Sequence, residues 1–282
     1  MRLLDGKTLA KKIRATVKNE VASLATKPGL AVILVGSDPA SHLYVSLKEK
    51  ACLTAGINFT KYLFLAQTTE AELLQKINEL NQDQKINGIL VQLPLPNQNA
   101  DKIIAAINPN KDVDGFHPEN LRRLEANETC LVSPVVLGVM ELLKKTGESL
   151  NNKKAVLVMS QIFARPFTAV FNQQKIQTEI VSADDPNIFA KTKNSDILIT
   201  AVGRPNLIVS QGLKNGAIVI DIGTTHLNGK VVGDVDISSI ESTDGWLTPV
   251  PGGVGPMTVA LLLRNVLAAS KQHNLPPTAP KN

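Results

Sequence analysis

A tyrosine and a lysine four residues apart, Tyr44 and Lys48, are the first residues in this chain whose types and spacing suggest chemistry. An apolar run at residues 30–35 and a turn precede them, and the pattern of residues 41–55 predicts a helix. Helix positions i and i+4 share a face, so the phenol and the amine would project side by side. The phenol could stack on a flat substrate while the amine moves a proton. A surface lysine beside a half-buried tyrosine is the alternative interpretation, so the pair needs further support.

Gln92 is a second candidate, because it ends an apolar strand predicted at residues 88–93. Pro94 and Pro96 follow and would stop the strand. In an open α/β sheet the ligand binds outside the carboxyl ends of the strands, so we expect Gln92 to lie near Lys48. A neutral amide there could hydrogen-bond the lysine without adding charge. A turn residue that faces solvent is the competing interpretation.

Asp114 is a third candidate, within the stretch of residues 108–116. Asp112, Asp114 and Gly115 could form an ordinary turn, and the further acidic positions of an EF-hand calcium loop are missing. A carboxylate near a ligand site can also accept two parallel hydrogen bonds from a heterocycle with adjacent N–H donors. We favour Asp114 for that role because the glycine after it frees the turn.

Alternating strands and helices surround these candidates, which is typical of a parallel sheet with both faces covered. Apolar runs of strand length alternate with segments of helical spacing. The predicted elements are helix 6–26, strand 30–35, helix 41–55, strand 58–65, helix 69–80 with Thr69 and Glu72 as a capping box, and strand 88–93.

A second alternation follows a helix that begins after Pro134, and it indicates a Rossmann-like series. Its predicted elements are strands 155–159, 176–181, 196–202 and 217–222, a helix at 166–173, and a hairpin of 224–227 with 230–232 around Asn228-Gly229. Dinucleotide folds usually have glycines between the first strand and helix, but residues 158–166 contain none. We expect side chains there to occupy space that a pyrophosphate needs.

Residues 248–258 contain three glycines and three prolines, which indicates a fixed turn with close backbone approach. Pro256 then starts an amphipathic helix, whose first amides could bind an anionic or carbonyl group. We therefore expect an α/β protein of two domains with a cleft between them. Residues 1–139, completed by a C-terminal helix in 257–282, would form one domain, and residues 140–256 the Rossmann-like one.

Composition excludes several other classes of protein. The chain has 282 residues and a net charge of +5, a small excess that would suit an anionic ligand. Only 4% of its residues are aromatic and they are not interleaved with basic residues, so nucleic-acid binding is a weak alternative. No apolar run approaches the ~20 residues that cross a bilayer, and the start lacks a signal-peptide core, so we expect a cytoplasmic protein. Cys52, Cys130 and four scattered histidines show no metal-ligand spacing, so we predict no metal.

Five motifs in order resemble the bifunctional methylenetetrahydrofolate dehydrogenase/methenyltetrahydrofolate cyclohydrolase (FolD-type) family over nearly the whole chain. They are Tyr44 to Lys48 and residues 91–96, 111–116, 233–235 and 249–258. The resemblance implies oxidation of 5,10-methylenetetrahydrofolate with NADP, or in some members NAD, and hydrolysis of the methenyl product to 10-formyltetrahydrofolate. It also implies a homodimer in one-carbon metabolism and purine biosynthesis, with tetrahydrofolate derivatives as ligands.

The resemblance also assigns roles to residues. Lys48 matches the catalytic lysine, Tyr44 the residue that stacks on the folate, Gln92 the glutamine that tunes the lysine, and Asp114 the carboxylate that holds the pterin. Such a lysine acts as a base only if its pKa is lowered. Further implied folate contacts are Leu93, Pro251 and Gly255, and implied nucleotide contacts are Ser160, Arg165, Pro166, Gly203, Asp221 and Gly223.

Departures from the family pattern cluster in the nucleotide half. Val158 and Ala164 stand where the family's phosphate loop has glycines, and Ser133 stands where the family has threonine. Asp184 and Asp185 follow the second strand of the Rossmann-like series. They could bind a ribose 2′-hydroxyl but would repel the 2′-phosphate of NADP.

Three alternatives remain open at this point. A homologue with an impaired nucleotide site would keep only the cyclohydrolase or folate binding. A short-chain dehydrogenase also uses a Y-x-x-x-K pair, but there the pair follows the glycine-rich loop, whereas Tyr44 precedes the corresponding region here. A non-enzymatic binding module would have no need for Lys48, Gln92 and Asp114 together.

Overall fold

The computed structural model describes residues 1–227 and 229–273, which form two compact units. Met1–Ala10 and Val135–Thr258 make up the six-stranded unit, while Lys11–Pro134 and the segment from Val259 onward make up the three-stranded unit. The sequence pattern places residues 1–10 with the first domain. The structure groups them with the six-stranded unit, because β1 (Arg2–Leu3) pairs with β11 (Trp246–Leu247) in its sheet.

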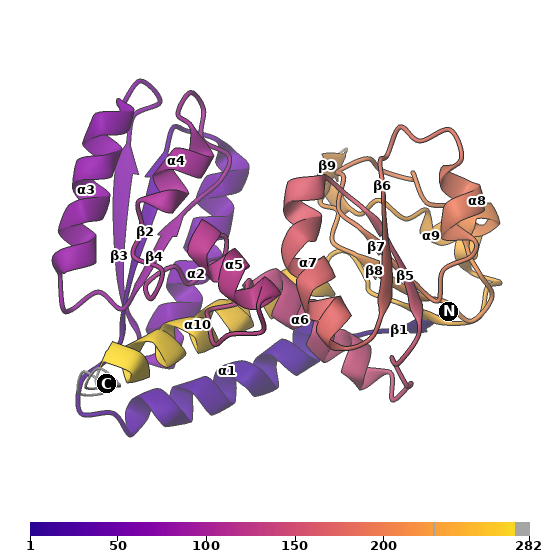
Figure 1. Ribbon diagram of the computed structural model, residues 1–282, viewed down its shortest axis with the longest axis horizontal. Helices are drawn as coiled ribbons and strands as arrows, with labels where there is room; N and C mark the ends of the chain where they lie inside the picture. Colours follow the sequence, from indigo (N-terminus) through magenta and orange to yellow (C-terminus); the bar gives the residue numbers. More distant parts are fainter. Residues whose placement is uncertain (228, 274–282) are drawn as a thin grey trace. The chain divides into compact units, whose positions relative to one another are not determined.

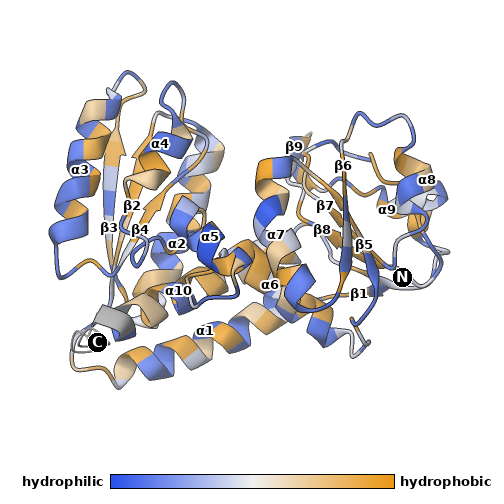
Figure 2. Cartoon of the chain, in the orientation of Figure 1, coloured by the Kyte–Doolittle hydropathy of each residue, from blue (hydrophilic) through white to orange (hydrophobic). Residues whose placement is uncertain are grey.

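The three-stranded unit contains a parallel sheet of β2 (Gly29–Val35), β3 (Asn58–Phe64) and β4 (Gly88–Val91) in the order β3-β2-β4. Every residue of β2 is buried, as is usual for a central strand covered on both faces. In Figure 2 both β2 and β4 are apolar along most of their length. The predicted alternation of strands and helices is therefore confirmed in this part of the chain.

Local capping fixes the helix that carries Tyr44 and Lys48, α2 (Pro39–Ala55). The side chain of Asp38 accepts a hydrogen bond from the backbone N–H of Ser41, and Pro39 occupies the first turn. Gly56 ends the helix in the left-handed conformation, with φ of 80°. Because both ends of α2 are fixed, the face that bears Tyr44 and Lys48 is fixed as well.

Two long helices, α1 (Gly6–Ala22) and α10 (Val254–His273), run side by side below the three-stranded sheet (Figure 1). Lys271 of α10 forms an ion pair with Glu20 of α1, with Nζ 2.6 Å from Oε2. Apolar residues of both helices share one core with β2 and α2; they include Val17, Val21, Leu262, Leu263 and Val266. Within the described residues, no helix combines the length and apolarity needed to cross a membrane.

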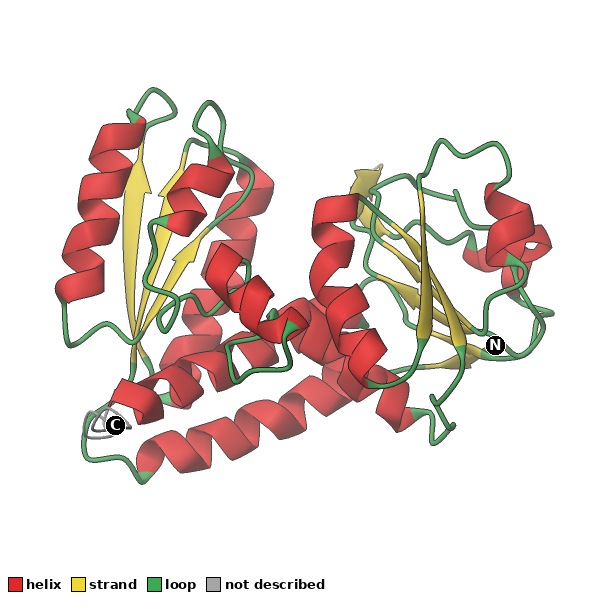
Figure 3. Cartoon of the chain, in the orientation of Figure 1, coloured by secondary structure: helices red, strands yellow, loops and turns green. Residues whose placement is uncertain are grey.

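The six-stranded unit has an all-parallel sheet in the order β1-β11-β8-β7-β5-β6, drawn in yellow in Figure 3. Its remaining strands are β5 (Lys154–Val158), β7 (Ile197–Thr200) and β8 (Ile218–Asp221) in the middle and β6 (Gln177–Val181) at one edge. The predicted hairpin is confirmed as the antiparallel pair β9 (Thr225–Leu227) and β10 (Lys230–Val232), although Asn228 lies outside the described residues. The Rossmann-like series is thus confirmed.

One helix begins earlier than its sequence predicts. The pattern favours a start at Pro166, whereas α7 (Gln161–Gln173) starts five residues before it, because Ser160 caps the helix by accepting from the N–H of Phe163. Pro166 therefore lies inside the helix and leaves one backbone acceptor without its usual donor. Other helices are α4 (Ala100–Ala105), α5 (Pro118–Glu125), α6 (Pro134–Lys145), α8 (Ile188–Thr192), α9 (Ile237–Ile240) and the 3₁₀ turn η1 (Ser210–Gly212).

A buried lysine from a later segment, Lys111, caps the C-terminal end of α3 (Glu70–Gln82). The start of α3 has the predicted capping box of Thr69 and Glu72. The Lys111 side chain is only 1% exposed, and its Nζ donates to the carbonyl oxygens of Leu80, at 3.0 Å, and Asp83, at 2.9 Å. These carbonyls lie at the negative end of the helix, where a cation is favourable. Lys111 thus connects α3 to the chain segment that leads to Asp114.

Replacing Lys111 by methionine should lower the free energy of unfolding by roughly 1–3 kcal/mol, because the carbonyls of Leu80 and Asp83 lose a charged donor. Urea unfolding at pH 7 measures the change. Lys85→Met is the matched control, since Lys85 is exposed in the same region and its loss should change stability by no more than about 0.5 kcal/mol. Equal stabilities for the two variants would contradict a capping role for Lys111.

Candidate active site

Lys48 is hydrogen-bonded to a glutamine whose orientation is itself fixed. Nζ of Lys48 donates to Oε1 of Gln92 at 2.7 Å, and Nε2 of Gln92 donates to the carbonyl oxygen of Leu93 at 2.8 Å. Because the amide nitrogen is engaged by Leu93, the amide oxygen must face the lysine. The predicted contact between Lys48 and Gln92 is therefore present, and it adds no charge to the site.

Asp114 follows a segment that pairs with β4. Ile89 and Asp112 form a parallel bridge, and the N–H of Ile89 donates to the carbonyl oxygen of Lys111 at 2.7 Å. The chain then turns, with the N–H of Gly115 donating to the carbonyl oxygen of Asp112. The Asp114 carboxylate in this turn acts electrostatically on the Lys48 amine, so it belongs to the same site as the amide that contacts Lys48.

The turn that presents Asp114 is held by a carboxylate that the sequence analysis did not select, that of Asp112. Its oxygens accept from the backbone N–H groups of Gly115, at 3.1 Å, and His117, at 2.8 Å, and from Nδ2 of Asn120 at 3.0 Å. Asp112 is 1% exposed, so it supports the turn from inside. A short acidic side chain three residues before a glycine was the available sequence signal.

Gly115 has φ of +73° and packs closely on the backbone before α6. A Cβ at this position would lie 2.3 Å from the backbone nitrogen of Ser133, so only glycine fits. Within the described residues, Oγ of Ser133 is buried and has no hydrogen-bond partner. A buried hydroxyl in this state is available to a water or a bound molecule.

The pKa values of Lys48 and Asp114 shift in opposite directions in this site. Burial lowers the pKa of Lys48, and the Asp114 carboxylate partly opposes that change. Burial raises the pKa of Asp114 to about 6, opposed by Lys48 and reinforced by the nearby Asp112. A lysine that loses its proton more readily and a carboxyl group that retains one more readily are both suited to proton transfer near neutral pH.

Tyr44 lies one turn before Lys48 on α2, and both side chains are half-buried, so the predicted common face is present. Leu93 follows Gln92 and is 39% exposed. The structure therefore brings Tyr44, Lys48, Gln92, Leu93 and Asp114 into one unit. The other two predicted folate contacts, Pro251 and Gly255, belong to the six-stranded unit, and their place beside the folate stays a prediction.

The glycine-free loop of the six-stranded unit is less obstructed than its sequence indicates. Val158 and Ala164 are both fully buried, and Val158 packs in the core of this unit with Val156 and Val181. Their side chains therefore point inward and do not fill the surface of the loop. Ser160 is exposed at the start of α7, where the first backbone N–H groups have no intrahelical partner.

Two buried aspartates organise the carboxyl edge of the six-stranded sheet. Asp221 is 3% exposed, and its oxygens accept from the backbone N–H groups of Gly223, Asp234 and Val235 at 2.9–3.1 Å. Burial raises the pKa of Asp221 to about 7, and these donors oppose that shift. Because the carboxylate is engaged internally, the backbone near Asp221 is the part that could reach a nucleotide.

Asp234 is the second of these carboxylates, and it is fully buried. It accepts from the hydroxyl of Thr200 at 2.8 Å and from the backbone N–H groups of Val202 and Arg204 at 2.9 and 2.8 Å. A Cβ on Gly223 would lie 2.2 Å from the Asp234 carboxyl carbon. Asp234 stands within the motif at residues 233–235, but sequence alone gives no sign of which backbone groups it holds.

The comparisons with known proteins agree with this geometry. Together, a half-buried lysine–glutamine–aspartate site and a parallel Rossmann-like unit define a two-domain α/β enzyme. Two family models match the chain: tetrahydrofolate dehydrogenase/cyclohydrolase, catalytic domain, over residues 4–114, and its NAD(P)-binding domain over residues 133–274. The chain belongs to the tetrahydrofolate dehydrogenase/cyclohydrolase family.

Its relatives match over almost their whole length. The bifunctional protein FolD of Wolinella succinogenes is 48% identical over 278 residues, covering 96% of this chain and 97% of the relative. The crystal structure of the FolD enzyme of Campylobacter jejuni is 40% identical with a TM-score of 0.92, covering 96% and 99% of the two chains. The Trypanosoma brucei enzyme, solved with NADP and an inhibitor, is 32% identical with a TM-score of 0.91, covering 96% and 97%.

Replacing Asp114 by asparagine should make the protein more stable at pH 8 and leave its stability unchanged at pH 4. The folded-state pKa of about 6 lies above the ordinary 3.8, so the wild type loses stability as the pH rises through this range. The shift corresponds to a gain on the order of 3 kcal/mol for the variant at pH 8. Urea unfolding at both pH values measures it.

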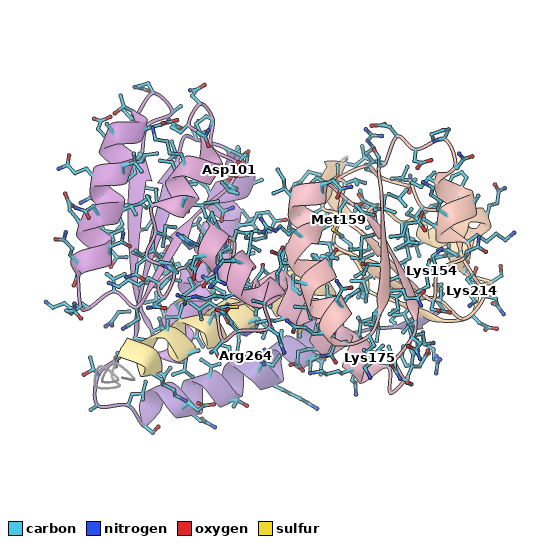
Figure 4. The ribbon with its side chains drawn as sticks, viewed as in Figure 1. Asp101, Lys154, Met159, Lys175, Lys214 and Arg264 are labelled. Carbon is cyan, nitrogen blue, oxygen red and sulfur yellow. The ribbon has the colours of Figure 1, made fainter. Side chains whose placement is uncertain are left out.

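Asp101→Asn is the matched control, because Asp101 is exposed in the first turn of α4 (labelled in Figure 4). An exposed carboxylate near a helix start is favourable, so this variant should gain nothing at pH 8. A pH-independent effect of Asp114→Asn would show that Asp114 ionises in the folded protein as it does in the unfolded chain.

Proposed function

We propose that this protein transfers a hydride from 5,10-methylenetetrahydrofolate to NAD(P) and hydrolyses the methenyl product to 10-formyltetrahydrofolate. The main observation in support is the half-buried amine of Lys48, with its lowered pKa, hydrogen-bonded to the neutral amide of Gln92 and close to Asp114. The membership of the chain in the dehydrogenase/cyclohydrolase family supports both activities.

The residues divide the chemistry as follows. Asp114 accepts two parallel hydrogen bonds from the 2-amino group and N3 of the pterin, and Tyr44 stacks on the folate ring. Hydride leaves the one-carbon bridge for the nicotinamide. Neutral Lys48 then takes one proton from water as the water oxygen bonds to the methenyl carbon. Lys48 returns that proton to the ring nitrogen whose bond to that carbon breaks, and the remaining proton on the oxygen is released to solvent as the formyl C=O forms. The amide of Gln92 orients Lys48 throughout.

The six-stranded unit would bind the nucleotide through its carboxyl edge. Ser160 and the first amides of α7 would hold the pyrophosphate, with Arg165 and Pro166 on the same helix and Gly203, Asp221 and Gly223 on the loops after β7 and β8. NADP is the first candidate, since the Trypanosoma brucei relative was solved with it, and NAD is the second. A cyclohydrolase without redox activity is not favoured, because Val158 and Ala164 point into the core.

The cellular setting follows from this activity. We propose a cytoplasmic enzyme of one-carbon metabolism whose product feeds purine biosynthesis, with folates as its partners and neither nucleic acid nor a membrane among them. No group of three or more potential metal ligands occurs among the described residues, and the proposed reaction uses none.

Replacing Lys48 by methionine should lower the rate of methenyltetrahydrofolate hydrolysis by roughly two to four powers of ten, because the proton carrier is lost. Hydrolysis and NADP- and NAD-dependent oxidation would be followed spectroscopically, and NADP binding would be measured by calorimetry. Lys50→Met, on an exposed position of the same helix, is the control and should keep near wild-type rates. A Lys48→Met variant with more than about a tenth of the wild-type hydrolysis would refute the proposed role.

We also propose a homodimer formed through the six-stranded unit. The family resemblance is the basis of this proposal, and the unit exposes apolar side chains that an interface could cover, those of Ile162, Phe189, Leu227 and Ile237. Sedimentation equilibrium should give twice the 30.3 kDa mass of the chain. A monomer at micromolar concentration would contradict this proposal.

A further inference from the structure

Asp184 and Arg204 form a bidentate ion pair at the carboxyl edge of the six-stranded sheet. Nη1 of Arg204 lies 2.5 Å from Oδ1 of Asp184, and Nη2 lies 3.2 Å from Oδ2. Asp184 follows β6 and Arg204 follows β7, and β5 lies between these strands. Because neighbouring strands are about 4.8 Å apart, the pair spans roughly 10 Å across the end of β5. In folds of this type, an acidic or arginine side chain at this edge meets the adenine ribose.

The backbone that carries Arg204 is held in place from below. Its N–H donates to the buried Asp234 carboxylate at 2.8 Å, and the N–H of Val202 does so at 2.9 Å. Gly203, between them, has φ of +68°, and its carbonyl oxygen accepts from the hydroxyl of Thr225 at 3.1 Å. The guanidinium of Arg204 therefore extends from a fixed loop. It could exchange the Asp184 carboxylate for another anion without movement of the backbone.

Only one of the two aspartates after β6 is turned outward. Asp185 is engaged within the protein: it pairs with Lys191 at 2.7 Å and accepts from the backbone N–H of Asn187 at 2.8 Å, and its side chain is 19% exposed. The side chain of Asp184 is 74% exposed, and that of Arg204 is 50% exposed. A ligand at this edge would therefore meet Asp184 and Arg204, while Asp185 serves the start of α8.

The loop between β5 and α7 contains no positively charged residue. Its residues are Met159 and Ser160, followed by Gln161 and Ile162 in the first turn of the helix. Met159 is 3% exposed and lies at the β5 end of α7, while Lys175 lies beyond the other end (Figure 4). A 2′-phosphate placed beside Asp184 would therefore meet Arg204, the cation already held by that carboxylate, whereas Arg165 lies in the second turn of α7.

We propose that the Asp184–Arg204 ion pair determines the choice between NAD and NADP, an inference that rests on the proposed dehydrogenase function. With NAD, the carboxylate keeps its pair with Arg204 and uses a remaining lone pair to accept the ribose 2′-hydroxyl. With NADP, the 2′-phosphate must replace Asp184 on the guanidinium and leaves that carboxylate unpaired beside a like charge. Asp184 therefore favours NAD, and Arg204 is what allows NADP to bind.

Two substitutions should move the preference in opposite directions. Asp184→Asn should raise kcat/KM for NADP about tenfold, because the carboxylate no longer repels the 2′-phosphate. It should lower kcat/KM for NAD about tenfold, because the ribose 2′-hydroxyl loses a charged acceptor. Arg204→Gln should lower kcat/KM for NADP at least tenfold and change that for NAD by less than about threefold. Methenyltetrahydrofolate hydrolysis, which needs no nucleotide, should stay near wild type in both.

Asp244→Asn is the matched control, because it removes an exposed carboxylate before β11, at the amino edge of the same sheet. Its ratio of the two kcat/KM values should stay within about twofold of wild type. If Asp184→Asn and Arg204→Gln change both nucleotides by one common factor, the pair only supports the loop and the proposal is wrong.

Calorimetry separates this proposal from the proposed activity. Adenosine 2′,5′-bisphosphate and 5′-AMP differ only in the distinguishing 2′-phosphate, and neither has the redox chemistry of the nicotinamide. Asp184→Asn should improve the affinity for the bisphosphate relative to 5′-AMP by about tenfold, and Arg204→Gln should reduce it similarly. Wild-type protein that binds both ligands but oxidises no methylenetetrahydrofolate would refute the dehydrogenase function alone. Unchanged relative affinities, or no binding of either ligand, would overturn the role of the ion pair.

Discussion

The burial of one amine is the constraint on which the active site depends. An ammonium group is stable in water, so Lys48 can exchange its proton near neutral pH only if the protein removes water without supplying a full countercharge. A glutamine meets both needs, because its amide oxygen accepts from Nζ and carries no charge. The carboxylate of Asp114, whose own pKa burial raises to about 6, moderates the lowering of the lysine pKa without cancelling it.

A different local contact fixes each of these side chains or the segment that bears it. Asp38 and Gly56 set the ends of α2, the carbonyl oxygen of Leu93 turns the Gln92 amide, and Asp112 holds the turn before Gly115. The same design recurs in the six-stranded unit, where Asp221 and Asp234 bind backbone N–H groups at the ends of the strands. In both units a buried carboxylate positions a loop while a neighbouring, more accessible side chain remains free to meet a ligand.

Comparison of expectation with structure shows where sequence patterns fail. Alternating apolar runs gave the strands and most helices, because parallel strands buried on both faces leave a strong signal. Pro166 was expected to start α7, but the hydroxyl of Ser160 caps an earlier turn, and that interaction outweighs the missing N–H of a proline. The glycine-free loop predicts an obstructed nucleotide site, yet the Val158 side chain packs into the core. The direction of that side chain depends on the orientation of β5, which the residue types do not reveal.

The sequence by itself determined the family and the order of the elements, and it selected Tyr44, Lys48, Gln92 and Asp114 as candidate site residues, because these residues stand in local motifs of fixed spacing. The tertiary structure alone decided which groups touch. Only the fold shows that the Asp114 carboxylate acts on the same amine that Gln92 contacts, and only the order of β6, β5 and β7 brings Asp184 to Arg204. Contacts between residues distant in the chain arise from strand order and side-chain direction, which local sequence does not encode.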